Sequence, residues 1–455
     1  MAPSKPATDD SQKAMFHFFK SEWFDFELVR LLGFAPYEGA EIAEVLQAVG
    51  SIRDSHPESW HTAWLRAGTK TEALAEEAER TGDRVAARRA YLRSSNYIRA
   101  AQYMLSSRPG HIDRRVLPTL ERAISNFQRA TSLMEGDVRI IHIPYEKKVK
   151  LPGYLYLPLA NKRVTEKVPV LINIGGGDST QEELYFINPV AGVEMGYAVL
   201  TYEGPGQGIV LRREELTMRP DWEVVNGKVL DFLYTYSNEH PELQLDLDRV
   251  AVCGASMGGY YALRAAADPR VKACVSIDPF YCMWDIMKGR MPEFLIHMFE
   301  TDGGFAPDGF FNGLVGFLQW SNFQARWEFN HLKTIFGVEQ PADVFRMMMS
   351  YTLSRPDDHE YLEQVRCPVF VTGAAAALYA KPEFSTERIY KALGHLNDDR
   401  KFKWLANDAA QGGLQAKVGA FGLSAHRTFA WLDQQFGIDR KIVLSDVGSL
   451  SSIDQ

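Results

Sequence analysis

The residue with the clearest capacity for chemistry is Ser256, in the G-x-S-x-G pattern Gly254-Ala255-Ser256-Met257-Gly258. The apolar run RVAVC precedes the pattern and the helical run YYALRAAA follows it, which is the strand, turn and helix context that such a serine needs. Ser256 is therefore predicted to stand at a helix N-terminus, where backbone amides and the helix dipole stabilise a developing anion. The Met257 amide is the expected first donor of an oxyanion hole.

A second donor is expected in the loop after VPVLINI, which reads Gly175-Gly176-Gly177-Asp178-Ser179-Thr180. Glycines let backbone N–H groups approach a substrate oxygen closely, and Gly176 or Gly177 is the predicted donor. Asp178, at the mouth of this loop, could reach a substrate or simply cap the following helix TQEELYFI. The next glycine-rich stretch, YEGPGQG at 202–208, is predicted to be a structural turn.

These loops require a parallel sheet to position them. Short apolar runs alternate with helical stretches, and strands buried on both faces with helical crossovers form a sheet covered on each side. VRIIHIPYE and LPGYLYLP alternate like a hairpin of half-buried strands. The core is predicted in two parts, 137–279 and 358–440. The runs that predict its later strands are VPVLINI, YAVLTY, RVAVC, KACVSI, CPVFVTG and KFKWLAN.

Two helical regions flank this core. Residues 15–136 place apolar residues three and four apart with charges between them, and predict a helical domain that is either a scaffold or dimer surface or a cap over the site. Residues 280–357, rich in aromatic side chains and methionine, predict a helical lid suited to a bulky apolar ligand. Residues 1–14 and 441–455 are predicted to be a disordered leader and a flexible tail.

Composition excludes several classes of function. The 455 residues carry a net charge of −8, spread along the chain, so no nucleic-acid or anionic-membrane partner is expected. No apolar run is long enough for a transmembrane helix, and the N-terminus lacks the apolar stretch of a signal peptide. The four cysteines have no metal-ligand spacing and predict free thiols in a reducing compartment. We expect a cytoplasmic protein without a metal or organic cofactor.

The order of these motifs is similar to that of a known group. A helical N-terminal domain followed by GGGDSTQEE, YEGPGQG and GASMGGYYALRAA resembles the α/β hydrolases with an N-terminal helical cap. That group includes 2,6-dihydroxypseudooxynicotine hydrolase and the fungal hydrolases that shorten polyketides. The resemblance covers roughly residues 16–437. It implies an α/β-hydrolase fold, a polyketide-like substrate, C–C cleavage of the retro-Claisen type, a pocket role for Asp178 and a possible homodimer.

The chain departs from this group where a serine needs its base and acid. The acid is expected shortly after the strand CPVFVTG, but the sequence there is AAAALY, and Ala376 marks the expected position. The histidine is expected after KFKWLAN and before the last helix, where Gln415 is the best match. The remaining histidines are poor substitutes; those considered are His297, His331, His359, His395 and His426.

Three explanations of the incomplete triad stay open. Ser256, the oxyanion loop and Asp178 could serve another reaction, such as condensation, cyclisation or proton transfer. Ala376 could be an engineered replacement of a catalytic aspartate, which leaves the absent histidine unexplained. The protein could also be a binding module in which the sharp turn at Ser256, the nucleophile elbow, no longer serves catalysis. The first explanation predicts an enzyme acting on a polyketide-like or aromatic β-dicarbonyl compound.

Overall fold

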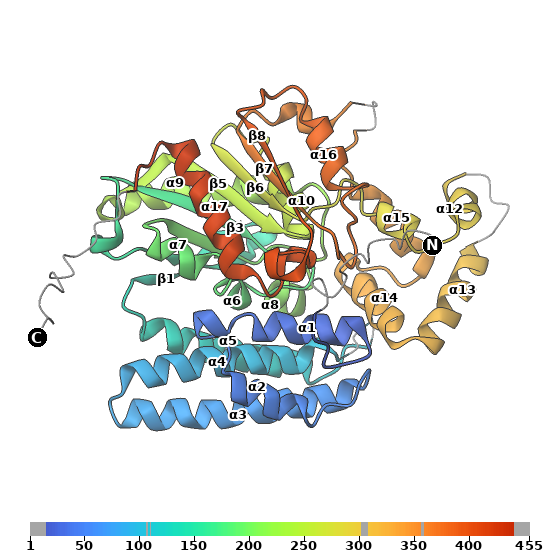
Figure 1. Ribbon diagram of the computed structural model, residues 1–455, viewed down its shortest axis with the longest axis horizontal. Helices are drawn as coiled ribbons and strands as arrows, with labels where there is room; N and C mark the ends of the chain where they lie inside the picture. The colour runs from blue at the N-terminus through green and yellow to red at the C-terminus, as the bar shows by residue number, and fades with distance from the viewer. Residues whose placement is uncertain (1–14, 106–107, 110, 302–307, 356–358, 441–455) are drawn as a thin grey trace, which may run out of the picture.

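The structure is a computed structural model that describes residues 15–105, 108–109, 111–301, 308–355 and 359–440 (Figure 1). The predicted leader (1–14) and tail (441–455) lie outside these residues, as does the segment 356–358 at the end of the predicted lid.

An eight-stranded sheet in the order β1-β2-β4-β3-β5-β6-β7-β8 lies at the centre of the described chain. β2 pairs antiparallel with both β1 and β4, and the other neighbours are parallel. Every residue of β3 is buried, as expected of a strand covered on both faces. The strands are β1 (Val138–Pro144), β2 (Lys150–Tyr156), β3 (Val168–Ile174), β4 (Ala198–Tyr202), β5 (Leu245–Ala255), β6 (Ala273–Ile277), β7 (Val369–Ala374) and β8 (Lys401–Ala406).

Helices cover both faces of this sheet. Ile172 of β3 belongs to the core that contains α9 and α10, whereas its neighbour Leu171 belongs to the core that contains α17, because successive strand residues point to opposite faces. The predicted α/β-hydrolase fold, with a mostly parallel and doubly wound sheet, is therefore confirmed. The helices are α6 (Gln181–Leu184), α7 (Pro189–Glu194), α8 (Gly208–Glu214), α9 (Trp222–Glu239), α10 (Met257–Ala265), α16 (Thr386–Ala392) and α17 (Phe421–Phe436).

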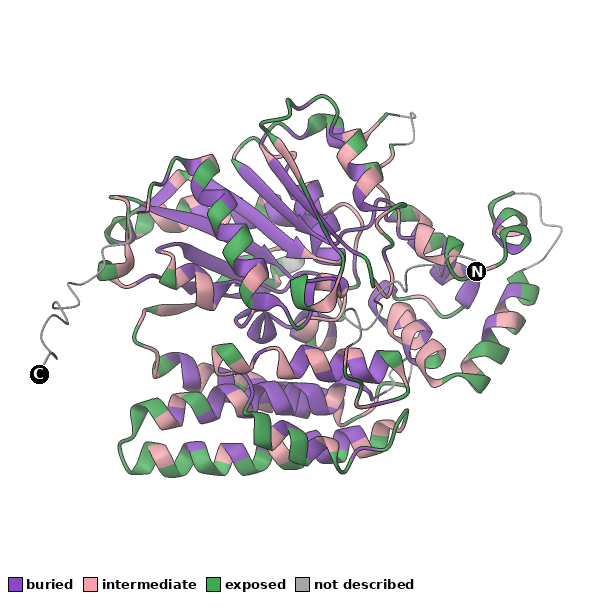
Figure 2. Ribbon diagram, in the orientation of Figure 1, coloured by how far each residue is buried: buried purple, intermediate pink, exposed green. Residues whose placement is uncertain are grey.

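The helical N-terminal domain lies against α6 and α8, beneath the loops that follow β3 and β4 (Figure 1). Its helices start at recognisable signals: Pro57 opens α3, and the Asp83 carboxylate accepts from the amide of Ala86 at the start of α4. Figure 2 shows α3 exposed on its outer face. The helices are α1 (Glu22–Leu32), α2 (Ile42–Val49), α3 (Pro57–Arg80), α4 (Arg84–Tyr103) and α5 (Val116–Ser132).

The helical lid lies between β6 and β7, where the sequence predicts it. Its helix α14 contacts the N-terminal domain through Trp327, whose indole N–H donates to Tyr103 O (2.7 Å) and whose ring lies 4.8 Å from that of Trp23. Lid and N-terminal domain therefore meet directly. The lid helices are α11 (Asp285–Lys288), α12 (Glu293–Glu300), α13 (Asp308–Ser321), α14 (Phe323–Phe336) and α15 (Pro341–Ser350).

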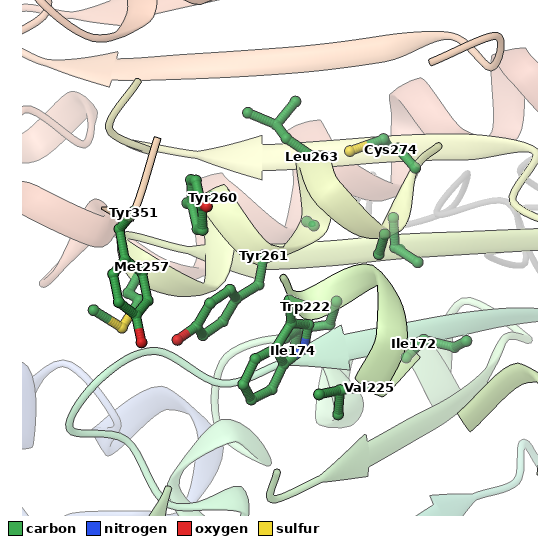
Figure 3. Packing of buried hydrophobic residues seen from close by; sticks show 14 of the residues in the cluster. Ile172, Ile174, Trp222, Val225, Met257, Tyr260, Tyr261, Leu263, Cys274 and Tyr351 are labelled. Atoms are coloured by element: carbon green, nitrogen blue, oxygen red, sulfur yellow. The ribbon is translucent and has the colours of Figure 1, made fainter. Parts of the chain in front are cut away.

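Aromatic packing anchors α10, the helix that follows Ser256. The rings of Tyr261 and Trp222 stack with centroids 3.9 Å apart and planes 13° apart, and Figure 3 shows this contact between α10 and α9. Tyr260 stacks on Phe280 at 4.9 Å on the lid side of α10. Large rings buried on both sides of the helix hold its N-terminus in place.

Candidate active site

The turn between β5 and α10 presents Ser256. Its backbone has φ 56° and ψ −118°, a conformation that is costly for a residue with a side chain and that concentrates at functional sites. The Ser256 amide donates to Ile277 O (2.8 Å), which ties the turn to the end of β6. A side chain at Gly254 would overlap Gly258 O, and one at Gly258 would come within 2.6 Å of Ile174 O. Both flanking positions therefore require glycine, as the motif predicts.

The predicted oxyanion donors lie beside this turn. Met257 is the first residue of α10, so its amide has no acceptor within the helix. Gly176 and Gly177 line the same cavity as Ser256 and Met257. Two loops therefore contribute backbone to one cavity, and amides that converge there would stabilise a developing oxyanion.

The predicted turn at 202–208 braces the glycine-rich loop. The Gln207 side chain donates to Gly175 O (2.7 Å) and Gly176 O (3.1 Å), and its carbonyl accepts from the amide of Gly204 (2.8 Å). Gln207 is 2% exposed. The buried Gln207 side-chain amide therefore fixes the backbone of the glycine-rich loop that follows β3.

A cavity of about 320 Å³ contains the site, and Ser256 lines it. Its polar lining comes from all three parts of the chain, and includes Glu27, Arg30 and Tyr103 of the N-terminal domain, Asn173, Asp178 and Gln415 of the core, and Arg290, Glu328 and His331 of the lid. Its apolar wall comes largely from the lid and from the residues that follow β6. The apolar wall includes Phe280, Met283, Ile286, Met287, Met291, Leu314, Val315, Phe345 and Met348.

Asp178 is held by residues of the N-terminal domain. Arg30 Nη1 lies 2.8 Å and Tyr103 Oη 2.6 Å from Asp178 Oδ2. Burial raises the pKa of Asp178, but the Arg30 charge and the hydrogen bond from Tyr103 outweigh burial and hold that pKa well below its usual range. Asp178 is therefore a carboxylate at neutral pH.

Arg30 also joins the N-terminal domain to the core. Its Nε and Nη2 each lie 2.6 Å from an oxygen of Glu183 in α6, a two-point contact that only a guanidinium makes. Arg99 Nη2 lies 3.2 Å from Glu183 Oε1. These side chains are almost fully buried, so the pairing is shielded from solvent.

Glu27, one turn before Arg30 on α1, is a buried acid at the cavity wall. It is 5% exposed, and its Oε1 lies 3.0 Å from Tyr103 Oη. Burial raises the pKa of Glu27 to about 7, although Arg30 opposes this shift. Sequence reasoning missed Glu27, Arg30 and Tyr103. The spacing of apolar residues in a helix does not show which of its polar residues will face a distant loop.

His331 of the lid lies next to Asp178's loop. Its ring stacks on Trp327 with centroids 4.9 Å apart and planes 9° apart, and its Nε2 lies 3.0 Å from Gly177 O. Burial lowers the pKa of His331. The contact with a carbonyl places the proton on Nε2, so this ring steadies the glycine-rich loop. Of the histidines that the structure describes, His331 alone lines the cavity.

Ala376 and Gln415, the positions at which the acid and the histidine of a triad are expected, lie near each other, but neither has an ionisable side chain. Ala376 forms a parallel bridge with Leu414, the neighbour of Gln415. Ala376 is exposed and does not line the cavity, whereas Gln415 lines it and is 2% exposed. The Gln415 amide donates to Asp278 O (3.1 Å). In the described part of the chain, no side chain forms a hydrogen bond with Ser256 Oγ.

A buried ion pair lies behind Gln415. Lys417 Nζ is 2.8 Å from Asp278 Oδ1, with both side chains 0% exposed, and Nζ also donates to Gly373 O (3.0 Å). Thr372 Oγ1 donates to the same Asp278 oxygen (2.7 Å). Burial lowers the pKa of Lys417 against the opposing effect of Asp278. In the sequence, the only sign of this pair was Asp278 itself, an acid directly after the apolar run KACVSI.

The described residues contain no cluster of three or more His, Cys, Asp or Glu side chains suited to a metal ion. None of their helices is both long and apolar enough to cross a membrane.

The fold, the elbow at Ser256 and the paired donor loops define a member of the alpha/beta hydrolase family. The family model matches residues 170–422, and the chain belongs to this family. Among curated proteins, it is 58% identical to an alpha/beta hydrolase, psoB, of Aspergillus fumigatus, over 93% of this chain and 95% of that protein.

It is also 51% identical to the hydrolyase poxO of Penicillium oxalicum, over 94% of this chain and the full length of that protein. Among solved structures, 2,6-dihydroxy-pseudo-oxynicotine hydrolase matches 90% of this chain and 95% of its own with a TM-score of 0.64 and 19% identity. AbyA5 matches the same shares with a TM-score of 0.57 and 20% identity. At these identities the two structures show the shared fold.

Proposed function

We propose that this protein is an enzyme that forms or breaks carbon–carbon bonds of a polyketide-like or aromatic β-dicarbonyl substrate through proton transfer at an oxyanion hole. The observation that carries the proposal is that Ser256 and Asp178 line one cavity, while no side chain among the described residues forms a hydrogen bond with Ser256 Oγ. We take Ala376 and Gln415 to occupy the positions at which a hydrolase would place its acid and histidine. A serine without a neighbouring base is a poor nucleophile. Its hydroxyl can still donate a hydrogen bond.

In this scheme the substrate carbonyl oxygen accepts from the Met257 amide and from Gly176 or Gly177. Ser256 Oγ donates to the same oxygen. Donors fixed in advance stabilise the enolate that forms when the α-proton passes by way of Asp178 to water. Asp178, held ionised by Arg30, orients the substrate or relays the proton. The enolate carbon then attacks a second carbonyl, giving condensation or cyclisation. In the cleavage direction, water adds to one carbonyl of the β-dicarbonyl group, and the C–C bond breaks to give a carboxylic acid and an enolate that is then protonated.

The cavity supports an amphipathic substrate. Aliphatic and aromatic side chains of the lid and the residues that follow β6 form one wall, and charged residues, among them Glu27, Arg30 and Asp178, lie elsewhere in the lining. A polyketide chain with a terminal dicarbonyl group would place its hydrocarbon against the lid and its oxygens near Asp178. The relatives named as hydrolases in Aspergillus and Penicillium are consistent with such a role in fungal secondary metabolism.

The test compares single variants on a β-dicarbonyl probe, benzoylacetone, with chromatography of cleavage and condensation products. Ser256→Ala and Asp178→Asn should each lower turnover at least tenfold while thermal unfolding stays cooperative. Ser350→Ala, which removes an exposed hydroxyl, and Asp398→Asn, which neutralises a 94% exposed carboxylate, serve as controls. Wild-type turnover in both site variants would exclude the proposal.

A binding protein is the second candidate. The absence of any side-chain hydrogen bond to Ser256 Oγ in the described residues favours it, because a serine without a base is a poor nucleophile. Such a protein would show ligand-dependent thermal stabilisation with no product formed. Detection of a product that requires Ser256 would exclude this alternative.

Location and assembly are part of the same proposal. We expect the protein to act in the cytoplasm, and a homodimer formed through the N-terminal domain remains a prediction. Light scattering coupled to size-exclusion chromatography measures the assembly directly.

A further inference from the structure

Two carboxyl groups share a single phenolic hydroxyl at the polar end of the cavity. Tyr103 Oη lies 2.6 Å from Asp178 Oδ2 and 3.0 Å from Glu27 Oε1. A phenol carries one proton and can donate it to only one acceptor at a time. The second contact is favourable only if the other carboxyl group donates to the Tyr103 oxygen, and a carboxyl group donates only when it is protonated.

The charges around the cluster identify which group holds the proton. Arg30 and Arg99 are the cations that contact it, and they pair with two carboxylates, Asp178 and Glu183. Glu27 is the third acid, and its approach to Arg30 is long, with Oε2 3.4 Å from Nη1. A carboxylate that is 5% exposed, and whose nearest cation is 3.4 Å away and already pairs with two other carboxylates, is strongly disfavoured. Two cations therefore leave Glu27 as the neutral member.

We propose that Glu27 is a catalytic residue of this protein: a neutral carboxylic acid that donates to Tyr103, faces the cavity and supplies a proton to the bound substrate. The proposal rests on the proposed function for its substrate. Glu27, Tyr103, Asp178 and Ser256 all line the cavity, so the acid and the oxyanion hole serve one space from two domains.

The proton transfer balances within the cluster. The O–H bond of Glu27 breaks and its proton bonds to an oxyanion or enolate of the substrate. The resulting Glu27 carboxylate is stabilised when the Tyr103 hydroxyl turns from Asp178 to Glu27, and Arg30 continues to neutralise Asp178. Glu27 regains a proton from the α-carbon of the next substrate or from water. The raised pKa of about 7 suits a group that gives and takes a proton at neutral pH.

The groups that face Glu27 from neighbouring elements set the conditions for its titration. They are Arg30 on α1, Arg99 and Tyr103 on α4, Asp178 after β3, Glu183 on α6, and Tyr379 after β7.

Infrared difference spectroscopy of the full chain at pH 6 tests where the proton lies. At this pH exposed carboxyl groups are ionised, so the carbonyl stretch of a protonated acid comes from buried groups such as Glu27 and Glu203. Glu27→Gln, whose amide also donates to Tyr103, should remove one such band, and Tyr103→Phe should shift it. Glu77→Gln on the exposed face of α3 should change nothing. A protonated-acid signal that Glu27→Gln leaves unaltered, because it belongs to the buried acids Glu203 or Glu182, would overturn the proposal.

The catalytic part is tested with the enol of benzoylacetone, whose conversion to the ketone is followed by absorbance. Glu27→Gln should lower kcat about 100-fold, the scale of general acid catalysis, with KM little changed. An unchanged kcat would also overturn the proposal. Retention of turnover in Ser256→Ala counts against the proposed function alone, because the Glu27 band does not depend on Ser256.

Discussion

Lys417 Nζ lies 2.8 Å from Asp278 Oδ1 behind Gln415, and neither side chain is exposed. Asp278 directly follows β6, and Lys417 lies in the segment between β8 and α17. A buried ion pair of this kind holds two loops in one arrangement, and removing one partner leaves an uncompensated charge.

Asp278→Asn should therefore lower the free energy of unfolding by about 3–5 kcal/mol. Replacing both partners, as in Asp278→Leu with Lys417→Met, should recover much of that loss because no buried charge remains. Urea denaturation of the single and double variants measures this coupling. Equal loss in Asp278→Asn and in Asp398→Asn, an exposed carboxylate, would contradict it.

Arg30→Lys should weaken the contact between the N-terminal domain and the core. A lysine cannot reproduce the two 2.6 Å contacts with Glu183 together with the 2.8 Å contact with Asp178. We expect a loss of about 2–4 kcal/mol in unfolding free energy and a higher pKa for Asp178. Arg80→Lys, at the exposed end of α3, is the matched control; a similar effect in both variants would show that the contact is not specific.

Glu27 should make stability depend on pH. Its pKa is about 7 in the folded chain against an ordinary value of 4.5, so between these values the unfolded chain has lost a proton that the folded chain retains. Stability is unaffected below pH 4.5 and falls as the pH rises to about 7, by about 3 kcal/mol at ~1.4 kcal/mol per pH unit. Glu27→Gln should remove this loss, so it should be more stable than wild type at pH 8 and equal at pH 4.5. Denaturation curves showing the same difference at both pH values would contradict the titration of Glu27.

Gly254→Ala should disrupt the elbow. Its Cβ would overlap Gly258 O, whereas a Cβ at Gly227 in α9 meets nothing within 4 Å. We expect Gly254→Ala to cost more than ~3 kcal/mol and Gly227→Ala to stabilise the chain by about 0.5–1 kcal/mol. Thermal unfolding of the two variants compares them directly. Two equally tolerated substitutions would show that the turn is looser than described.

The fold was predictable from the sequence because its signals are local. The apolar runs at VPVLINI and RVAVC, the glycines around Ser256 and the spacing of apolar residues in 15–136 each depend on nearby residues. The core, the N-terminal domain and the lid all follow from such patterns. Ser256, Met257 and the 176–178 loop line one cavity for the same reason, since loops after neighbouring parallel strands meet at one sheet edge.

The polar end of the cavity depends on long-range contacts and was not predictable. Glu27 and Arg30 look like ordinary surface charges of an amphipathic helix, and only the docking of α1 against α6 brings them to Asp178. Lys417 likewise carries no local signal. His331 reaches Gly177 only because the lid folds back over the site.

The central claim is that Ser256 acts as a hydrogen-bond donor without a histidine base, and labelling by a fluorophosphonate probe, read by intact mass, tests it most directly. We predict negligible labelling of the wild-type chain and measurable labelling of Ser256 in the double variant Ala376→Asp with Gln415→His. Rapid labelling of the wild-type chain that Ser256→Ala abolishes would contradict the account, because it would demonstrate an activated serine.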